Sequence, residues 1–178
     1  LLETKQYIEK QLGRMSCSRY DQKSFHWFVR RSRDDRLIGT AGLTNLNYER
    51  KSIEWGFGVD PDLWGTGYIL QIQECLKAYV FKDLRLNRLH GITMIGNQRT
   101  IESVLASGAV HEGTIRDYYC KSGKFIDGWQ YSILAKDYFN ETNRTHGRNS
   151  VLITNADILK VLREIMPLES IDTSSSME

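Results

Sequence analysis

Two glycines, Gly65 and Gly67, stand immediately before a helical pattern in this 178-residue chain. The first backbone N–H groups of a helix have no partner inside the helix and lie at its positive end, so they bind anions well. Glycine at such a junction allows a bulky anion to approach the main chain closely. The pattern predicts a site for a phosphate or pyrophosphate group, and the alternative interpretation is an ordinary tight turn.

Two familiar nucleotide-binding signatures do not fit this loop. The P-loop signature needs Lys followed by Ser or Thr after its last glycine, and here Tyr68 follows Gly67. The dinucleotide-binding fingerprint needs a third glycine within a parallel βαβ unit, whereas the strands before this loop are predicted to form an antiparallel meander. The loop therefore points to another kind of phosphate-binding architecture.

The strand that precedes the loop, residues 53–59, alternates strictly in its side chains. One face carries large apolar side chains, those of Ile53, Trp55, Phe57 and Val59. The other face carries Glu54, Gly56 and Gly58. A pair of glycines weakens a strand and often marks a place where something approaches the backbone. An extended ligand is expected to lie against this second face.

Local patterns predict the elements that must position the loop and the strand. An amphipathic helix is expected over 1–16, and strands are expected over 24–31, 37–48 and 53–59. After the loop we expect a helix over 68–83, a strand over 86–95, a helix over 97–107 ended by Gly108, and strands over 110–121 and 126–135. The polar residues 140–150 are predicted to be a linker, followed by an amphipathic helix and a polar tail over 151–178.

Composition sets limits on the class of protein. A chain of 178 residues suits one domain and a short appendage. Twenty-four basic against 22 acidic residues give a net charge of +2, too balanced to indicate a nucleic-acid or membrane partner. No membrane span or signal peptide is expected, and the cysteines Cys17, Cys75 and Cys120, without a CxxC, are typical of reduced thiols in the cytoplasm. Because the chain opens on Leu1, part of the native N-terminus is expected to precede it.

Three strings of residues resemble one known family, the GNAT N-acetyltransferases. The strings are Trp64-Gly65-Thr66-Gly67-Tyr68, then Asn97-Gln98-Arg99-Thr100, and then Gly108-Ala109-Val110-His111-Glu112-Gly113 with Arg116. The nearest branch holds Rim-type ribosomal-protein acetyltransferases and amino-sugar acetyltransferases. The resemblance covers residues 24–139, and three ordered motifs are more specific than any one of them.

The resemblance implies an α+β fold in α/β/α layers. The expected GNAT fold has a mixed, strongly twisted sheet with helices on both faces, splayed open between strands 53–59 and 86–95. Its first strand would precede Leu1, so residues 1–139 would form an N-terminally incomplete acetyltransferase domain. The remaining residues would form the linker over 140–150 and the appendage over 151–178.

The same resemblance implies acetyl-CoA as cosubstrate, seated in the opening of the sheet, and no metal. Pantetheine contacts are carried over onto Phe57, Gly58 and Val59. Pyrophosphate contacts are carried over onto Trp64, Gly65, Thr66, Gly67 and Tyr68, and contacts on the far side onto Asn97 and Thr100. The chain departs from the family at Asp62, where Gln or Arg is usual, and at Ala109, where Phe is usual.

Forming an amide from a thioester requires a neutral amine, and a free alkylamine has a pKa of about 10, so a base must take its proton. Glu54 is the candidate catalytic base, because it lies on the face with the glycines and the family often has a carboxylate there. The alternative is a surface glutamate paired with Arg50 or Lys51. His26 and His111 are alternative bases that could equally be structural histidines.

The group that stabilises the departing thiolate is less evident. Many relatives have a tyrosine at the position of Val104, and the hydroxyls near it are those of Ser103 and Thr100. Ser103 is the candidate catalytic acid, and the alternative is a helix-surface serine. A backbone N–H of Phe57 or Val59 would serve as an oxyanion donor without any dedicated acid.

The resemblance implies transfer of acetyl to the primary amine of a small molecule, such as an amino sugar. The alternatives are a protein N-terminus, a carrier-bound amine, or a non-catalytic CoA-binding or scaffolding module. Residues 151–178 are similar to the start of an acyl carrier protein, and the alternative is an ordinary amphipathic helix that docks on the domain or a partner. A homodimer is a candidate assembly.

Overall fold

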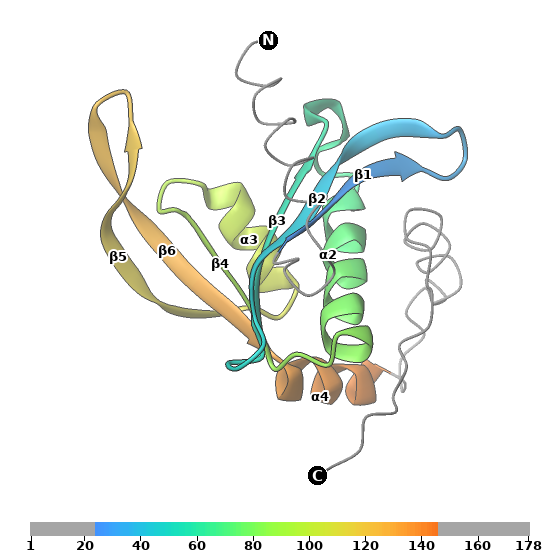
Figure 1. The fold of residues 1–178 in the computed structure, drawn as a ribbon. Coiled ribbons are helices and arrows are strands. Elements are labelled where there is room, and N and C mark those ends of the chain that lie inside the picture. The colour runs from blue at the N-terminus through green and yellow to red at the C-terminus, as the bar shows by residue number, and fades with distance from the viewer. Residues whose placement is uncertain (1–23, 146–178) are drawn as a thin grey trace. The chain divides into compact units, whose positions relative to one another are not determined.

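The computed structural model describes residues 24–145 (Figure 1). The helix expected over 1–16, the end of the expected linker and the whole appendage over 151–178 lie outside the described residues. The described residues up to Glu141 belong to one compact unit, which contains the loop, the glycine-bearing strand and the predicted site.

A six-stranded sheet forms the body of this unit, with the strand order β1-β2-β3-β4-β6-β5. The strands are β1 (Phe25–Arg31), β2 (Arg36–Asn47), β3 (Ser52–Val59), β4 (Arg88–Met94), β5 (Val110–Lys121) and β6 (Lys124–Leu134). Only β3 and β4 pair in parallel, and the other neighbours are antiparallel. The predicted strands are confirmed, with ends displaced by one or two residues.

The sheet divides between β3 and β4, as the family resemblance implies. These two strands pair over only three residues each: Ser52 with Arg88, Ile53 with Leu89, and Glu54 with His90. Beyond Glu54 the two halves of the sheet diverge, and Figure 1 shows β1–β3 and β4–β6 spreading apart from their common base. The mixed, splayed sheet and the α+β class are confirmed.

The crossover from β3 to β4 contains a short 3₁₀ turn and one long helical stretch. The turn is η1 (Pro61–Leu63), and the stretch runs through α2 (Tyr68–Ala78) and η2 (Tyr79–Asp83). The prediction of one helix over 68–83 holds except that its last turn is π-helical, with the Leu84 N–H bonding the Tyr79 carbonyl at 2.9 Å.

The second crossover helix, α3 (Gln98–Ala106), lies beside α2. Gln73 Nε2 on α2 donates to Ser103 Oγ at 3.2 Å. Near the end of α3, the buried Lys77 ammonium donates to the Ser107 carbonyl at 2.8 Å, so a cation from α2 satisfies a free carbonyl of the neighbouring helix. These contacts join the middle and the end of α2 to the middle and the end of α3.

The last described element, α4 (Ala135–Thr145), was not expected from the sequence. Residue 135 was predicted to end a strand, and residues 140–145 were predicted to begin a linker, but all of them are helical. Asp137 Oδ2 accepts the Leu134 N–H at 3.2 Å, which caps the first turn of the helix. The Tyr138 ring is buried 5.2 Å from the Phe81 ring, and this burial stabilises a segment whose later residues are polar.

The apolar core supports the point where β3 and β4 meet. Its fully buried apolar side chains are those of Leu43, Ile53, Leu89, Ile133, Val80 and Val104. Ile53 and Leu89 are register partners, one position before Glu54 and His90. Burying such a side chain contributes about 1.5–3 kcal/mol, so the end of the β3–β4 ladder is anchored by packing.

Candidate active site

The opening of the sheet begins directly after Glu54. From Trp55 to Val59, β3 remains paired with β2 but has no partner on its other edge. The residues expected to contact pantetheine, Phe57, Gly58 and Val59, lie along this open edge. A Cβ atom added at Gly56 would meet nothing within 4 Å, so the face of β3 that carries the glycines is open at this residue.

The Glu54 carboxylate is half-buried and held by a neutral partner. Its Oε2 accepts a hydrogen bond from Asn45 Nδ2 at 2.7 Å. Asn45 sits at the break in the β2–β3 register and has a φ of 55°, a conformation that asparagine tolerates. Within residues 24–140, Glu54 forms no salt bridge, so the expected alternative pairing with Arg50 or Lys51 is not found.

His90 is the neighbour that sequence reasoning missed. Glu54, His90 and Ser132 are register partners across β3, β4 and β6, so their side chains share one face of the sheet. Burial lowers the pKa of His90 below its usual value, although the charges of Glu54 and Glu112 favour protonation. The structure therefore presents a neutral imidazole beside a carboxylate.

Next to Ser132, an ion pair between Arg88 and Glu112 borders the polar side chains of Glu54, His90 and Ser132. Arg88 Nη1 donates to Glu112 Oε1 at 2.6 Å, and Ser132 Oγ donates to the same oxygen at 2.8 Å. These bonds lower the pKa of Glu112, with the Arg88 bond as the largest cause. Glu112 is thus paired with a cation, whereas Glu54 has no cationic partner among the described residues.

Two tyrosines border the opening from β5 and β6. The Tyr119 hydroxyl donates to the Ile92 carbonyl at 2.7 Å, and the Tyr131 hydroxyl accepts the Trp55 indole N–H at 3.2 Å. Burial raises the pKa of Tyr131 to about 12, and burial is also the main cause of the raised pKa of Tyr119. Both phenols are protonated at neutral pH, and the negative charge of Glu54 contributes to raising the pKa of each.

The glycine loop has the geometry that an anion site requires. Gly65 and Gly67 have φ values of 77° and 85°, and Gly67 is the N-cap of α2. No side chain caps this helix, and its first turn contains no acidic residue, so the N–H groups of residues 68–70 lack a side-chain partner there. Thr66 Oγ1 donates to the Leu63 carbonyl at 2.5 Å, which tightens the loop. Asp62, the departure from the family pattern, is exposed.

The start of α3 reaches the same loop. Asn97 is the N-cap of α3, with its Oδ1 accepting the Thr100 N–H at 3.4 Å and its Nδ2 donating to Thr93 Oγ1 at 3.3 Å. The Arg99 guanidinium carbon lies 4.0 Å from the centroid of the Trp64 ring. The glycine loop and the start of α3, both of which were predicted to contact the cofactor, are therefore neighbours.

The predicted acid and the alternative bases have other partners. Ser103 Oγ donates to the Thr100 carbonyl at 3.0 Å while accepting from Gln73, and Val104 is fully buried. His111 stacks on Trp129 with ring centroids 4.6 Å apart. His26 pairs with Gly42 across β1 and β2, away from the β3–β4 ladder.

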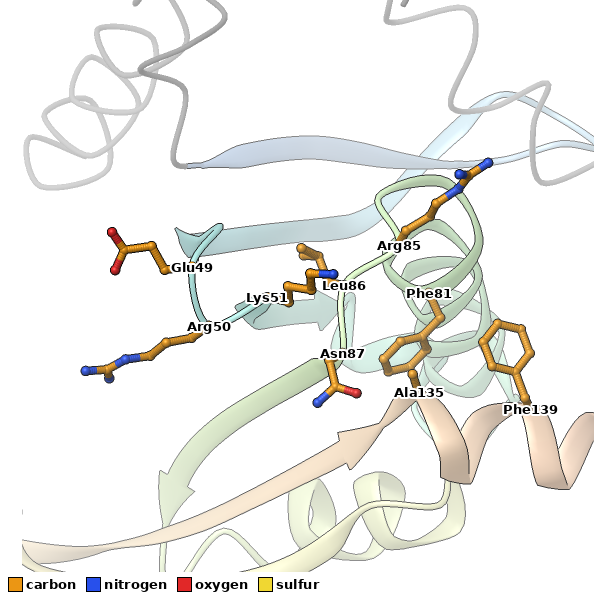
Figure 2. A pocket seen from close by; sticks show the side chains of 9 residues that line it. All are labelled: Glu49, Arg50, Lys51, Phe81, Arg85, Leu86, Asn87, Ala135 and Phe139. Carbon is orange, nitrogen blue, oxygen red and sulfur yellow. The ribbon is translucent and has the colours of Figure 1, made fainter. Parts of the chain in front are cut away.

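A cavity of about 550 Å³ lies elsewhere, at the base of the sheet where β3 and β4 begin. It is lined by Glu49, Arg50, Lys51, Phe81, Arg85, Leu86, Asn87, Ala135 and Phe139. In Figure 2 the Arg50 and Arg85 side chains point away from each other, so the cations of this cavity do not converge on one point. None of the residues lining this cavity is among the site residues predicted from the sequence.

A mixed sheet that opens between two parallel strands, with a glycine loop at a helix start beside the opening, defines the class of GNAT acetyltransferases. Residues 1–110 match the family model described as "Acetyltransferase (GNAT) domain", and the chain belongs to this family. It is 30% identical over 104 residues to an uncharacterized N-acetyltransferase, p20, of Bacillus licheniformis, an alignment that covers 58% of this chain and spans 58% of the relative's length. It is 26% identical to the uncharacterized N-acetyltransferase YoaA of Bacillus subtilis, over 75% of this chain and 77% of that protein.

Solved structures support the same fold. The crystal structure of spermidine N-acetyltransferase from Vibrio cholerae in complex with CoA and spermine has a TM-score of 0.66 and 22% sequence identity, covering 78% of this chain and 77% of that one. Across residues 24–145, no helix is long and apolar enough to cross a membrane. Among the side chains of residues 24–140, no group of three His, Cys, Asp or Glu could hold a metal ion.

Proposed function

We propose that this chain is an acetyl-CoA-dependent N-acetyltransferase that acts on the primary amine of a small molecule. The observation that carries the proposal is the open edge of β3, which runs from the Glu54 carboxylate at one end to the uncapped start of α2 at the other. A donor with a reactive thioester at one end and phosphates at the other matches this order of groups. The family of the chain and the CoA bound by the fold neighbour from Vibrio cholerae support the choice of donor.

In this proposal, the coenzyme is bound mainly by backbone groups. Phe57, Gly58 and Val59 contact pantetheine along the open edge, and residues 64–68 surround the pyrophosphate at the start of α2. Asn97 and Thr100 act by forming the start of α3 beside that loop, where the Asn97 side chain accepts the Thr100 backbone N–H. Bound acetyl-CoA would supply the acetyl thioester that the acceptor amine attacks.

Glu54 is proposed as the base that takes the proton of the acceptor ammonium. Among the described residues, its half-buried carboxylate has a neutral amide as hydrogen-bond partner and no salt bridge, so no cation competes with the acceptor for it. A backbone N–H of Phe57 or Val59 is proposed as the donor to the developing oxyanion. To protonate the departing thiolate, Ser103 must first turn its hydroxyl from the Thr100 carbonyl, so the structure weakens the support for this residue relative to a backbone donor.

The acceptor is proposed to be a small amine, with an amino sugar as the first candidate. The relation to a spermidine N-acetyltransferase of Vibrio cholerae, 24% identical over 65% of this chain, supports a polyamine as a second candidate. A protein N-terminus and a carrier-bound amine remain the alternative acceptors. An acceptor panel of glucosamine, spermidine, a peptide with a free N-terminus and an amine-loaded carrier protein separates these classes.

Thiol release from acetyl-CoA in the presence of the panel tests the activity, and calorimetry with CoA tests binding. We expect CoA to bind at micromolar concentration and at least one acceptor to stimulate thiol release. Glu54→Gln should lower kcat by 100-fold or more without changing CoA affinity, in line with the usual effect of a general base. Glu49→Gln, in the exposed turn that precedes β3, is the matched control. Binding without turnover on any acceptor would instead favour the non-catalytic CoA-binding module.

A proposal for the organisation of the whole chain follows from its sequence. We infer an acetyltransferase domain over 1–139 and a carrier-like segment over 151–178, joined through α4 and the residues that follow it. Two free thiols, Cys75 and Cys120, are compatible with the proposed cytoplasmic location. Light scattering of the purified chain tests the proposed homodimer, and limited proteolysis tests the boundary near residue 145.

A further inference from the structure

A cation–π pair connects the glycine loop with the start of α3. The Arg99 guanidinium carbon lies 4.0 Å from the centroid of the Trp64 ring. The indole is itself held, because its Nε1 donates to the Val59 carbonyl at 3.1 Å, at the end of the open edge of β3. The platform on which Arg99 rests is therefore fixed to the strand that borders the opening.

The Arg99 guanidinium has no anionic partner among the residues that the structure describes. A guanidinium stacked on an aromatic ring keeps its N–H donors at the edges of the plane, where they remain available for hydrogen bonds. The first turn of α3 contains no acidic residue that would compete for them. Arg99 thus carries a positive charge and unused donors beside the loop.

The loop itself supplies no positive charge. Residues 60–68 contain two acidic residues, Asp60 and Asp62, and no Lys or Arg. Asp60 is neutralised by Arg36, whose Nη2 lies 2.8 Å from the carboxylate, and Asp62 is exposed. A phosphate at the start of α2 would meet backbone N–H groups but no cation from the loop, so a cation has to come from another element.

We propose that Arg99 is a coenzyme-phosphate-binding residue, positioned by Trp64 and supplying the positive charge that residues 60–68 lack. The inference rests on the proposed function, since it assumes that the loop receives a coenzyme. Guanidinium groups bind phosphate oxygens through two parallel hydrogen bonds, a geometry that lysine does not reproduce. The phosphate contacted is either the pyrophosphate or the 3′-phosphate of CoA, which have the same chemistry.

The experiment compares CoA and 3′-dephospho-CoA binding to the full chain by calorimetry, for the wild type and Arg99→Gln. We expect Arg99→Gln to weaken CoA binding by about 10- to 100-fold, the usual effect of losing a charge-assisted pair of hydrogen bonds. Arg50→Gln, an exposed arginine at the base of the sheet, should bind CoA like the wild type. If the loss is equal for both ligands, Arg99 contacts the pyrophosphate; if it disappears with 3′-dephospho-CoA, Arg99 contacts the 3′-phosphate.

Two further variants separate phosphate binding from a purely structural contact. Arg99→Lys should recover part of the affinity, because it keeps the charge without the fork, and Trp64→Leu should lose affinity because the platform is gone. With S-acetylpantetheine, which has no phosphate, Arg99→Gln should show the kcat/KM of the wild type. An equal loss with this substrate, or CoA binding by Arg99→Gln within twofold of the wild type, would overturn the proposal. Failure of the wild-type chain itself to bind CoA would overturn the proposed function as well, which is a different result.

Discussion

Replacing Gly56 by alanine separates the stability of the protein from the binding of its ligand. Gly56 lies on β3 two residues beyond Glu54, and it is exposed. A Cβ atom at this position meets no protein atom within 4 Å, and the backbone is not left-handed there. Because glycine in a strand costs about 0.5–1 kcal/mol relative to alanine, Gly56→Ala should leave the free energy of unfolding unchanged or raise it by up to about 1 kcal/mol.

The effect on ligand binding should have the opposite sign. If the coenzyme or the acceptor lies against this face, the new methyl group intrudes into the space that the ligand occupies. Overpacking of that kind costs about 1–3 kcal/mol, which corresponds to a Kd or KM raised by about 5- to 150-fold. A variant that is at least as stable as the wild type but binds worse cannot owe its defect to misfolding.

Urea unfolding measures the stability term, and calorimetry with CoA together with acceptor KM measures the binding term. Gly91→Ala is the contrasting variant, since its Cβ would lie 2.6 Å from Tyr131 Oη and 3.2 Å from Trp55 Cδ1. It should lose about 1–3 kcal/mol of stability. The reasoning is refuted if Gly56→Ala binds CoA and acceptor within twofold of the wild type, or if it loses more than about 1 kcal/mol of stability.

Three other results are expected. Burial raises the pKa of Cys75 to about 11, so its thiol should react slowly at pH 8. Iodoacetamide at this pH should label Cys120 but not Cys75 in the folded chain, and both cysteines in urea. Peptide mass spectrometry measures the labelling. Burial lowers the pKa of His90, so this histidine binds a proton more tightly in the unfolded chain than in the folded one. The free energy of unfolding should therefore fall as the pH drops below about 6.5. Urea unfolding at pH 7.5 and at pH 5 should show a smaller fall for His90→Gln than for the wild type. Lys77→Met should cost about 1–3 kcal/mol in the same assay, because it leaves the Ser107 carbonyl without its donor.

The parts of the fold that the sequence predicts well are those fixed by local signals. The three-strand meander follows from short polar turns between alternating segments, and the start of α3 follows from the capping side chain of Asn97. The loop before α2 follows from Gly65 and Gly67, both of which have the positive φ that favours glycine. These features depend on a few neighbouring residues, so one sequence is enough to find them.

The parts that the sequence did not reveal depend on pairing between distant segments. His90 becomes part of the site only because it is the parallel partner of Glu54, and no local pattern contains that register. Ser103 is a reasonable acid by its position on α3, but its hydroxyl is engaged by Thr100, a contact that helical spacing alone does not decide. The beginning of α4 is held by the tertiary contact of Tyr138, which outweighs a polar composition.

A single strand sets the spacing of the whole proposed site. Glu54 is the last residue of β3 that pairs with β4, and Val59, five positions on, accepts the hydrogen bond that holds Trp64. At about 3.3 Å per residue, the carboxylate end and the phosphate end of the opening lie about 16 Å apart along the strand. Packing of Ile53 against the core fixes one end of this distance, and the indole contact fixes the other. An inserted residue between Glu54 and Val59 would lengthen the distance by one step and also turn Glu54 to the opposite face relative to the loop, so it should abolish transfer even where CoA still binds.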